Sequence, residues 1–252
     1  MPLQEFFTDN PRLAIAFSGG ADSAYLLYAA KNAGCDVCAY FIKSPFQPEF
    51  ELNDAIKLTD SLGIPLTVGA LDILQDPAIA LNTADRCYYC KTAILSKLRE
   101  LALSDGYTTL CDGTNADDDE ADRPGMRALR EQGVISPLRD HGLSKGEIRR
   151  RSCQAGLFTY DKPAYACLAT RIPAGTAITG EILSKIENAE NALFGMGFSD
   201  FRVRLLPPDN ANIQLPGAQF SKAFERRSEI LEALRPGFSC VVLDLTPRSP
   251  LL

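Results

Sequence analysis

The stretch Leu13–Ser23, LAIAFSGGADS, decides the fold. An apolar run ends at Phe17, and two adjacent glycines then stand between two serines, with an aspartate before the second serine. Glycines after a strand allow a tight turn that presents successive backbone N–H groups, and the next helix adds its positive N-terminal end. We therefore expect a phosphate-binding loop. It is not the Walker pattern, because no Gly-Lys-Ser/Thr follows, and it is not the dinucleotide pattern GxGxxG.

Apolar, β-branched runs alternate with helix-forming stretches through the first two thirds of the chain. This order predicts an α/β fold, a doubly wound parallel sheet covered by helices on both faces. Such sheets bind ligands beyond the carboxyl ends of their strands, where the glycine turn stands. The expected strands are 13–17, 37–42, 66–71 and 108–113, and the expected helices between them are 22–33, 54–62 and 92–103.

The last third of the chain predicts a smaller α+β domain. Ser144–Glu147 fits a capping box that opens another helix, after which residues 158–179 show no sustained period. Beyond them we expect a helix with apolar residues at 182, 186, 189 and 193, two strands around a Pro-Pro-Asp-Asn turn, a helix over 221–234 and a final strand from 240. We place the domains at 1–175 and 176–252.

Composition limits the class of protein. The 252 residues carry 26 basic and 32 acidic side chains, so no global positive charge favours a nucleic-acid partner. The N-terminus lacks a basic segment followed by a long apolar one, and no apolar run reaches the roughly 18 residues of a membrane span. We therefore expect a cytoplasmic protein without a membrane partner. A single histidine argues against a histidine-based metal site or catalytic triad.

The eight cysteines are read as reduced thiols, since small disulfide-stapled domains are far shorter than this chain. Cys87 and Cys90 form a CxxC pair beside Arg86 and Lys91, two cations expected to lower thiol pKa values. Cys167 lies in the irregular segment. The other five are expected to serve packing: Cys35, Cys38, Cys111, Cys153 and Cys240.

The glycine turn resembles the SGGxDS loop of the PP-loop ATP pyrophosphatase superfamily, whose fold is adenine nucleotide alpha hydrolase-like. The matching residues are Ser18, Gly19, Gly20, Asp22 and Ser23. The resemblance implies that the loop holds the pyrophosphate of ATP and that the enzyme forms an adenylate. We expect Asp22 to orient Mg²⁺, because hard cations prefer carboxylate oxygens.

The stretch GTNADDDEADRPG, residues 113–125, follows the fourth expected strand and is expected to complete the nucleotide pocket through Asn115. Its acidic run, Asp117–Glu120, is read as a solvated face rather than a metal site.

Four stretches together resemble the LarE family of ATP-dependent sacrificial sulfur transferases. They are GTNADDDEADRPG, DRCYYCK around Cys87, KPAYACLATRIP around Cys167 and SGGADS. That family serves the nickel-pincer nucleotide cofactor of lactate racemase. The resemblance implies adenylation of a carboxylate of a pyridinium dicarboxylate mononucleotide, followed by thiocarboxylate formation with sulfur from Cys167. When the cysteine is sacrificed, its Cβ–S bond breaks and dehydroalanine remains.

The CxxC pair resembles that of LarE members in which three cysteines hold a [4Fe-4S] cluster. The resemblance assigns the cluster to Cys87, Cys90 and Cys167 and leaves one iron open for a sulfide that would spare the protein's own sulfur. Thiolates are natural cluster ligands, whereas a structural zinc site needs a fourth ligand that this stretch lacks. The alternative is unligated thiols with Cys167 alone reactive.

Arg202 and Arg204 alternate on an expected strand, so their side chains face the same side and suit a phosphate. By resemblance to the family's RVR sequence they hold the phosphate of the substrate. The chain departs from the family at Gln214, where a glutamate is expected, and at 246–250, where TPRSP replaces Tyr-Arg-Ser-Gly. The missing glutamate puts a metal site there in doubt. The resemblance also implies a homo-oligomer, a trimer or a hexamer.

Three alternative functions remain open at this stage. A tRNA thiolase also pairs SGGxDS with three cysteines, but it needs a basic surface for its substrate. An amidotransferase-type synthetase needs the loop and has no use for Cys87, Cys90 and Cys167. A nucleotide-sensing or iron-sulfur carrier protein would bind ATP without chemistry.

Overall fold

The computed structural model describes residues 2–118 and 124–248. They group into two units that each pack mainly on themselves. The first unit comprises Met1–Ile73 and Asp85–Lys162, and the second comprises Leu74–Ala84 and Pro163–Leu252.

The second unit is therefore made of two separate segments of chain. They are joined by hydrogen bonds: Asn82 Nδ2 donates to Pro173 O at 2.8 Å, and the Ile178 and Gly175 amides donate to Ala80 O and Asn82 O at 2.7 and 3.0 Å. The expected domain boundary after residue 175 differs from this division. It assigns Cys167 and residues 74–84 to the first domain, whereas the structure groups them with the second unit.

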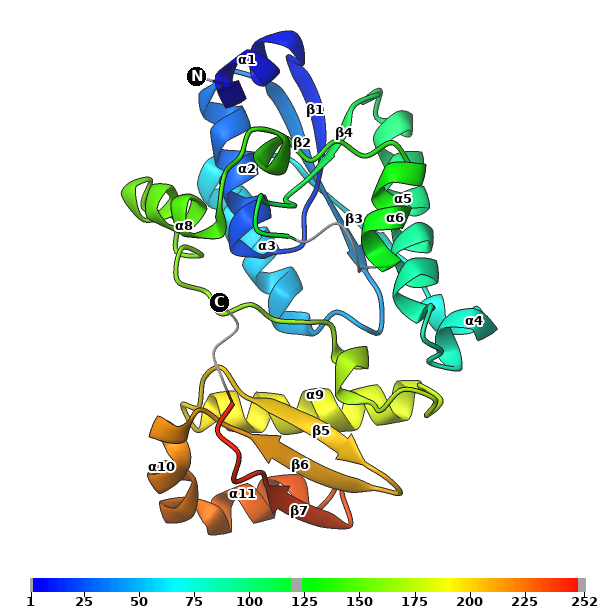
Figure 1. Ribbon diagram of the computed structural model, residues 1–252, viewed down its shortest axis with the longest axis vertical. Coiled ribbons are helices and arrows are strands. Elements are labelled where there is room, and N and C mark those ends of the chain that lie inside the picture. Colours follow the sequence, from blue (N-terminus) through cyan, green and yellow to red (C-terminus); the bar gives the residue numbers. More distant parts are fainter. Residues whose placement is uncertain (1, 119–123, 249–252) are drawn as a thin grey trace. The chain divides into compact units, whose positions relative to one another are not determined.

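A four-stranded parallel sheet forms the centre of the first unit (Figure 1). Its strands are β1 (Arg12–Ala16), β2 (Asp36–Lys43), β3 (Leu66–Ala70) and β4 (Leu110–Asp112), in the order β3-β2-β1-β4. The α/β prediction is confirmed. The chain winds outward from β1 to β3 and then returns to the other side of β1, so β1 and β4 are the strands at the switch point. Their carboxyl ends are level, since Ala16 pairs with Asp112.

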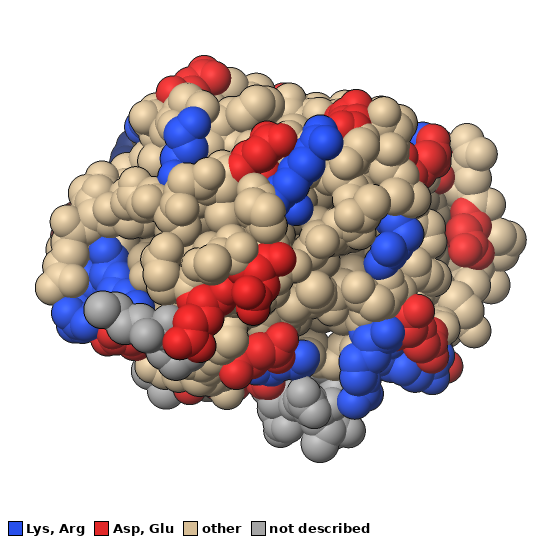
Figure 2. All heavy atoms as spheres, turned by 90° about the horizontal axis from the view of Figure 1, so that it is seen from above, with Lys and Arg blue, Asp and Glu red and all other residues tan. Residues whose placement is uncertain are grey.

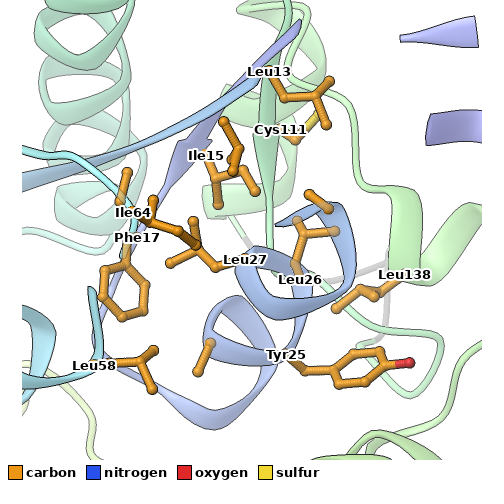
Figure 3. Close-up of a cluster of buried hydrophobic side chains, with 14 of the residues drawn as sticks. Leu13, Ile15, Phe17, Tyr25, Leu26, Leu27, Leu58, Ile64, Cys111 and Leu138 are labelled. Carbon is orange, nitrogen blue, oxygen red and sulfur yellow. The ribbon is translucent and has the colours of Figure 1, made fainter. Parts of the chain in front are cut away.

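Helices cover both faces of this sheet, as the strand pattern predicts. Residues 13, 15, 37, 39 and 41 pack in one core cluster with α1 (Pro2–Asp9), α2 (Ala21–Asn32), α3 (Glu49–Leu62), α7 (Pro137–Asp140) and α8 (Lys145–Gln154). The alternate residues 14, 38, 40 and 42 pack against α5 (Arg86–Ser104) and α6 (Pro124–Glu131). This alternation follows from the two-residue period of a strand. Figure 3 shows the first cluster, with Leu26 and Leu27 of α2 beneath Leu13 and Ile15.

Two helices of the first unit begin earlier than the sequence pattern predicts. α3 begins at Glu49 directly after Pro48, and α5 begins at Arg86, so Cys87 and Cys90 lie in its first two turns. The capping box is confirmed in part. The Ser144 hydroxyl accepts the Glu147 amide at 3.3 Å, whereas the Glu147 carboxylate bonds Arg150 and Arg151.

The second unit is the expected α+β arrangement. Its sheet has the order β5-β6-β7, with β5 (Arg202–Leu206) antiparallel and β7 (Cys240–Leu243) parallel to β6 (Asn210–Gln214). The helix expected over 221–234 is interrupted at Arg226, whose side chain donates to Met196 O at 2.6 Å. The other elements are α4 (Pro77–Ala80), α9 (Gly180–Gly195), α10 (Phe220–Glu225), α11 (Arg227–Leu234) and the short 3₁₀ turns η1 (Ile73–Gln75), η2 (Leu168–Arg171) and η3 (Gly217–Gln219).

Charges of both signs share the surface. Figure 2 shows lysine and arginine side chains interspersed with aspartate and glutamate on one face of the molecule. Within the described part of the chain, every helix is too short or too polar to cross a membrane.

Gly113, the residue after β4, lies against the backbone of α2. A Cβ at this position would lie 2.6 Å from Ser23 N and 2.8 Å from Ser23 Cα, closer than real Cβ contacts allow. Glycine is therefore required for the end of β4 to approach the start of α2.

Gly113→Ala is expected to destabilise the protein by about 1–3 kcal/mol, because its methyl group meets backbone that cannot move aside. Gly146→Ala is the matched control, since Gly146 lies on the exposed side of α8 with no atom near its added Cβ, and there alanine should stabilise by up to about 1 kcal/mol. Denaturant midpoints measure both, and equal midpoints would contradict the close packing at Gly113.

Candidate functional site

The loop after β1 is shaped by its glycines and its two serines. Gly19 adopts a left-handed conformation, with φ of +74°, and a Cβ there would lie 2.9 Å from Glu51 O. The Ser18 and Ser23 hydroxyls lie 3.1 Å apart, and Ser23 Oγ donates to Gly20 O at 3.3 Å. The two serine side chains therefore stabilise the turn by hydrogen bonds within it.

Gly20 is the N-cap of α2 and has no side chain to bond the amides of the first turn. Those amides and the positive end of a twelve-residue helix face the carboxyl end of the sheet. This arrangement suits an anion such as a phosphate group.

Asp22 in the first turn of α2 meets Asn115 from the segment after β4. Asn115 Nδ2 donates to Asp22 Oδ2 at 3.1 Å, and the amide side chain is buried. Asp22 Oδ1 is also buried and finds no hydrogen-bond partner among the described residues. A buried carboxylate oxygen left in this way fits a Mg²⁺ ion or its bound water.

Burial raises the pKa of Asp22 above its ordinary value, and the Asp118 carboxylate raises it further. The hydrogen bond from Asn115 and the positive charges of Lys145 and Arg149 act in the opposite direction. The carboxylate therefore lies where added positive charge is favourable.

Lys145 and Arg149 of α8 are site residues that the sequence analysis missed. Both lower the pKa of Asp22 through their positive charge, so each acts electrostatically on this carboxylate. Their spacing of four residues on a helix that the capping box had located was the available signal.

The acidic run after β4 shapes its own loop. Asp118 Oδ2 accepts the Asn115 amide at 3.1 Å, and Asp117 Oδ2 accepts the Lys145 amide at 2.8 Å. Asp119 and Glu120 lie outside the described residues, so the reading of the whole run as a solvated face stays a prediction.

Cys87 and Cys90 lie three residues apart near the start of α5, hence on one side of the helix. Cys87 is exposed and Cys90 is half-buried. The Arg86 guanidinium is buried, and its Nη2 donates to Cys87 Sγ at 3.3 Å. A buried positive charge therefore stands directly beside one sulfur of the pair.

Of the five cysteines assigned to packing, three are buried and two are not. Cys35, Cys38 and Cys111 are buried, and burial raises the pKa of each thiol. Cys153 and Cys240 are exposed, so the packing assignment was wrong for them. Cys153 lies on the outer side of α8, and Cys240 lies on an edge strand where alternate residues face solvent.

Cys167 lies in the second unit as the N-cap of η2. Its carbonyl accepts Thr170 Oγ1 at 2.8 Å and the Thr170 amide at 3.0 Å. Next to it, the fully buried Arg171 pairs with Glu190 at 2.8 Å and donates to Ala166 O at 2.9 Å. The backbone next to Cys167 is thus held by an arginine of a buried ion pair.

Arg202 and Arg204 differ in surroundings although they share a sheet face. Arg202 is buried, its guanidinium donates to Phe201 O and Ala164 O at 2.7 Å each, and burial with nearby Arg171 and Arg248 lowers its pKa to about 10. Arg204 is exposed and donates to Thr170 O at 2.9 Å. An anion therefore has access to Arg204.

Gln214 links Arg204 to Asp244. Its Oε1 accepts Arg204 Nε at 2.8 Å, and its Nε2 donates to Asp244 Oδ2 at 3.0 Å. A glutamate would place a second carboxylate against Asp244, so the amide suits this position.

The predicted site residues are divided between the two units. The first unit holds the loop residues with Asn115 and, separately, the pair Cys87 and Cys90. The loop residues are Ser18, Gly19, Gly20, Asp22 and Ser23. The second unit holds Cys167, Arg202 and Arg204. Within residues 2–118 and 124–248, no group of three or more His, Cys, Asp or Glu side chains is arranged to hold a metal ion. The three-cysteine ligand set stays a prediction.

Several relatives align with almost the whole chain. Pyridinium-3,5-bisthiocarboxylic acid mononucleotide synthase of Lactiplantibacillus plantarum is 34% identical over 242 residues, which cover 94% of this chain and 87% of that protein. The chain belongs to the LarE family. An uncharacterized protein of Synechocystis sp., slr1717, is 36% identical over 247 residues, 96% of this chain and 92% of its own length.

A more distant group of relatives matches part of the chain. The tRNA-specific 2-thiouridylase MnmA of Pseudothermotoga lettingae is 28% identical over 190 residues, 60% of this chain and 54% of that protein. The parallel sheet of the first unit is that of the PP-loop superfamily. No protein-family model matches the chain.

Asp22→Asn is expected to raise the thermal midpoint at pH 7, because it removes a charge whose burial is unfavourable. The folded-state pKa lies above the ordinary 3.8, so the ionised form destabilises the native state above that pH. The gain should therefore disappear as the pH falls toward 3.8. The same variant should weaken Mg²⁺-dependent ATP binding at least about tenfold.

Asp60→Asn, at an exposed aspartate of α3, is the control and should change neither quantity. A midpoint for Asp22→Asn that equals the wild type at every pH would contradict the buried charge.

Proposed function

We propose that this chain is an ATP-dependent sulfur transferase that adenylates a carboxylate of a pyridinium dicarboxylate mononucleotide and converts it to a thiocarboxylate. The observation that carries the proposal is the glycine turn with Asp22 and Asn115 at the switch point of the sheet. The name of the L. plantarum relative, a bisthiocarboxylic acid mononucleotide synthase, supports this substrate class.

The first unit supplies the binding of ATP. Amides of Gly20 and of the first turn of α2 bond the phosphate oxygens, and Lys145 and Arg149 offset their charge. Bound through Asp22, Mg²⁺ would neutralise charge as pyrophosphate departs. Adenylation is needed because a carboxylate oxygen is a poor leaving group and AMP is a good one.

Cys167 supplies the sulfur in the sacrificial version of the reaction. The thiolate attacks the acyl carbon, a C–S bond forms and AMP leaves with the electron pair of the C–O bond. Loss of the Cα proton of Cys167 then drives cleavage of its Cβ–S bond. The products are the thiocarboxylate and a dehydroalanine at position 167.

A [4Fe-4S] cluster on Cys87, Cys90 and Cys167 is the proposed alternative source of sulfur. One helix turn carries the first two thiols, and the Arg86 guanidinium beside Cys87 offsets the negative charge of a thiolate-ligated cluster. When bound, such a cluster would present an open iron that carries sulfide and would leave the Cβ–S bond of Cys167 intact.

Arg204 is proposed to hold the phosphate of the substrate. Its guanidinium donates to Gln214 Oε1 and Thr170 O but is exposed, whereas that of Arg202 is buried and bonds two carbonyls. Arg202 therefore acts in this proposal by adding positive charge behind Arg204.

The remaining proposals concern the cellular location, the oligomeric state and the class of substrate. A cytoplasmic homo-oligomer, a trimer or a hexamer, is proposed from the family. The mixture of charges on the face drawn in Figure 2 supports a small-molecule substrate over a nucleic acid. Binding of tRNA at low salt would instead favour the thiouridylase type of function.

Cys167 is tested by single turnover. With MgATP and the dicarboxylate mononucleotide, and without an added sulfur source, the intact mass of the cluster-free protein should fall by one hydrogen sulfide molecule, localised to Cys167. Cys167→Ala should form no thiocarboxylate, whereas Cys240→Ala, at an exposed cysteine, should behave as wild type. Full product formation by Cys167→Ala would contradict the proposal and favour an amidotransferase-type synthetase.

The cluster is tested by anaerobic reconstitution with iron and sulfide. Wild type should gain the broad visible absorption of a [4Fe-4S] cluster, and Cys87→Ala should lose most of it because one of three ligands is missing. Cys153→Ala removes an exposed thiol outside the ligand set and should keep the absorption. Identical spectra for wild type and Cys87→Ala would leave the sacrificial route as the source of sulfur.

A further inference from the structure

Lys162, the last residue of the first unit, reaches back to the phosphate loop. Its Nζ donates to Gly19 O at 3.0 Å and to Asp54 Oδ2 of α3 at 2.6 Å. The side chain is only 16% exposed, and its ammonium lies 5.4 Å from the centre of the Phe50 ring. The ammonium is therefore held in a defined place by a carbonyl, a carboxylate and an aromatic face.

The bond to Gly19 O fixes the orientation of one peptide group. In a planar trans peptide the C=O and N–H bonds point in opposite directions, so holding the carbonyl of Gly19 also directs the N–H of Gly20. Gly19 has a left-handed backbone and no side chain, so its peptide group would otherwise rotate more freely than that of a residue with a Cβ atom. Gly20 is the N-cap of α2, beside the amides that face the anion site, and its N–H donates to Ser18 Oγ in a long hydrogen bond of 3.4 Å.

The main chain of Lys162 is fixed as well. Its carbonyl accepts Arg149 Nη2 at 2.9 Å, and Arg149 is one of the two α8 cations that act on Asp22. Lys162 therefore connects three parts of the first unit that surround the site: the loop, α3 and α8.

We propose that Lys162 is a positioning residue that orients the Gly19–Gly20 peptide so that the loop amides receive the phosphates of ATP. The inference rests on the proposed function only in that the ligand is ATP. It assigns a role to a residue of the KPAYACLATRIP stretch that is separate from the chemistry of Cys167.

The test measures binding of MgATP and of adenosine to the full chain. Lys162→Met keeps the length and apolar stem of the side chain and removes its positive charge. We expect MgATP affinity to fall on the order of tenfold, the size of one charge-assisted hydrogen bond, and adenosine affinity to stay unchanged. Lys162→Arg retains a cationic donor and should recover most of the affinity for MgATP.

Lys57→Met is the matched control, because Lys57 lies on the same helix as Asp54 and its ammonium lies 4.4 Å from the centre of the Phe158 ring. It should bind MgATP as wild type does. Should Lys162→Met fail to fold, Lys162→Gln is measured by the same criteria.

Unchanged MgATP affinity in a folded variant would overturn the inference. Equal losses for MgATP and adenosine would also overturn it, since a general structural defect does not distinguish the phosphates. A wild-type chain that binds no MgATP would overturn the proposed function itself and the inference with it.

Discussion

The site depends on one backbone contact, that of Gly113 with Ser23. It brings the end of β4 against the first turn of α2, and only then does Asn115 reach the Asp22 carboxylate. Residues about ninety positions apart in the sequence thereby form one polar pair at the switch point of the sheet. The left-handed Gly19, which faces Glu51 O, fixes the same helix start from its other side. Two glycines without side chains thus determine where the side chains of the site meet.

The sheet was predictable because a buried parallel strand leaves a strong local pattern. Apolar residues of β1 and β2 fill both faces, and each run is bounded by helix-forming sequence. Helix starts were less predictable: α3 begins five residues before the expected position because Pro48 already ends the preceding loop. The break at Arg226 also escaped prediction, since it is supported by a carbonyl of Met196, thirty residues away.

The candidate site was predictable only where its residues are consecutive. SGGADS is a local signal, and a loop of that composition has few other uses. Three basic residues of the site look like ordinary surface charges in the sequence: Lys145, Arg149 and Lys162. Only the packing of α8 and of the chain after it gives them their positions. The exposed Cys153 and Cys240 illustrate the reverse case: in sequence they resemble buried residues, and only the outward side of a helix or an edge strand sets them apart.

The composition of the second unit from Leu74–Ala84 and Pro163–Leu252 has a consequence for synthesis on the ribosome. Residues 74–84 emerge early, yet the carbonyls and amide of Ala80 and Asn82 gain their partners only when residues 172–178 follow. The 78 residues of Asp85–Lys162, which belong to the other unit, are translated in between. In a nascent chain, this short segment therefore lacks its partner segment until residues 172–178 have been synthesised. A single division of the gene also cannot separate the two units intact, because the second unit is formed from two segments.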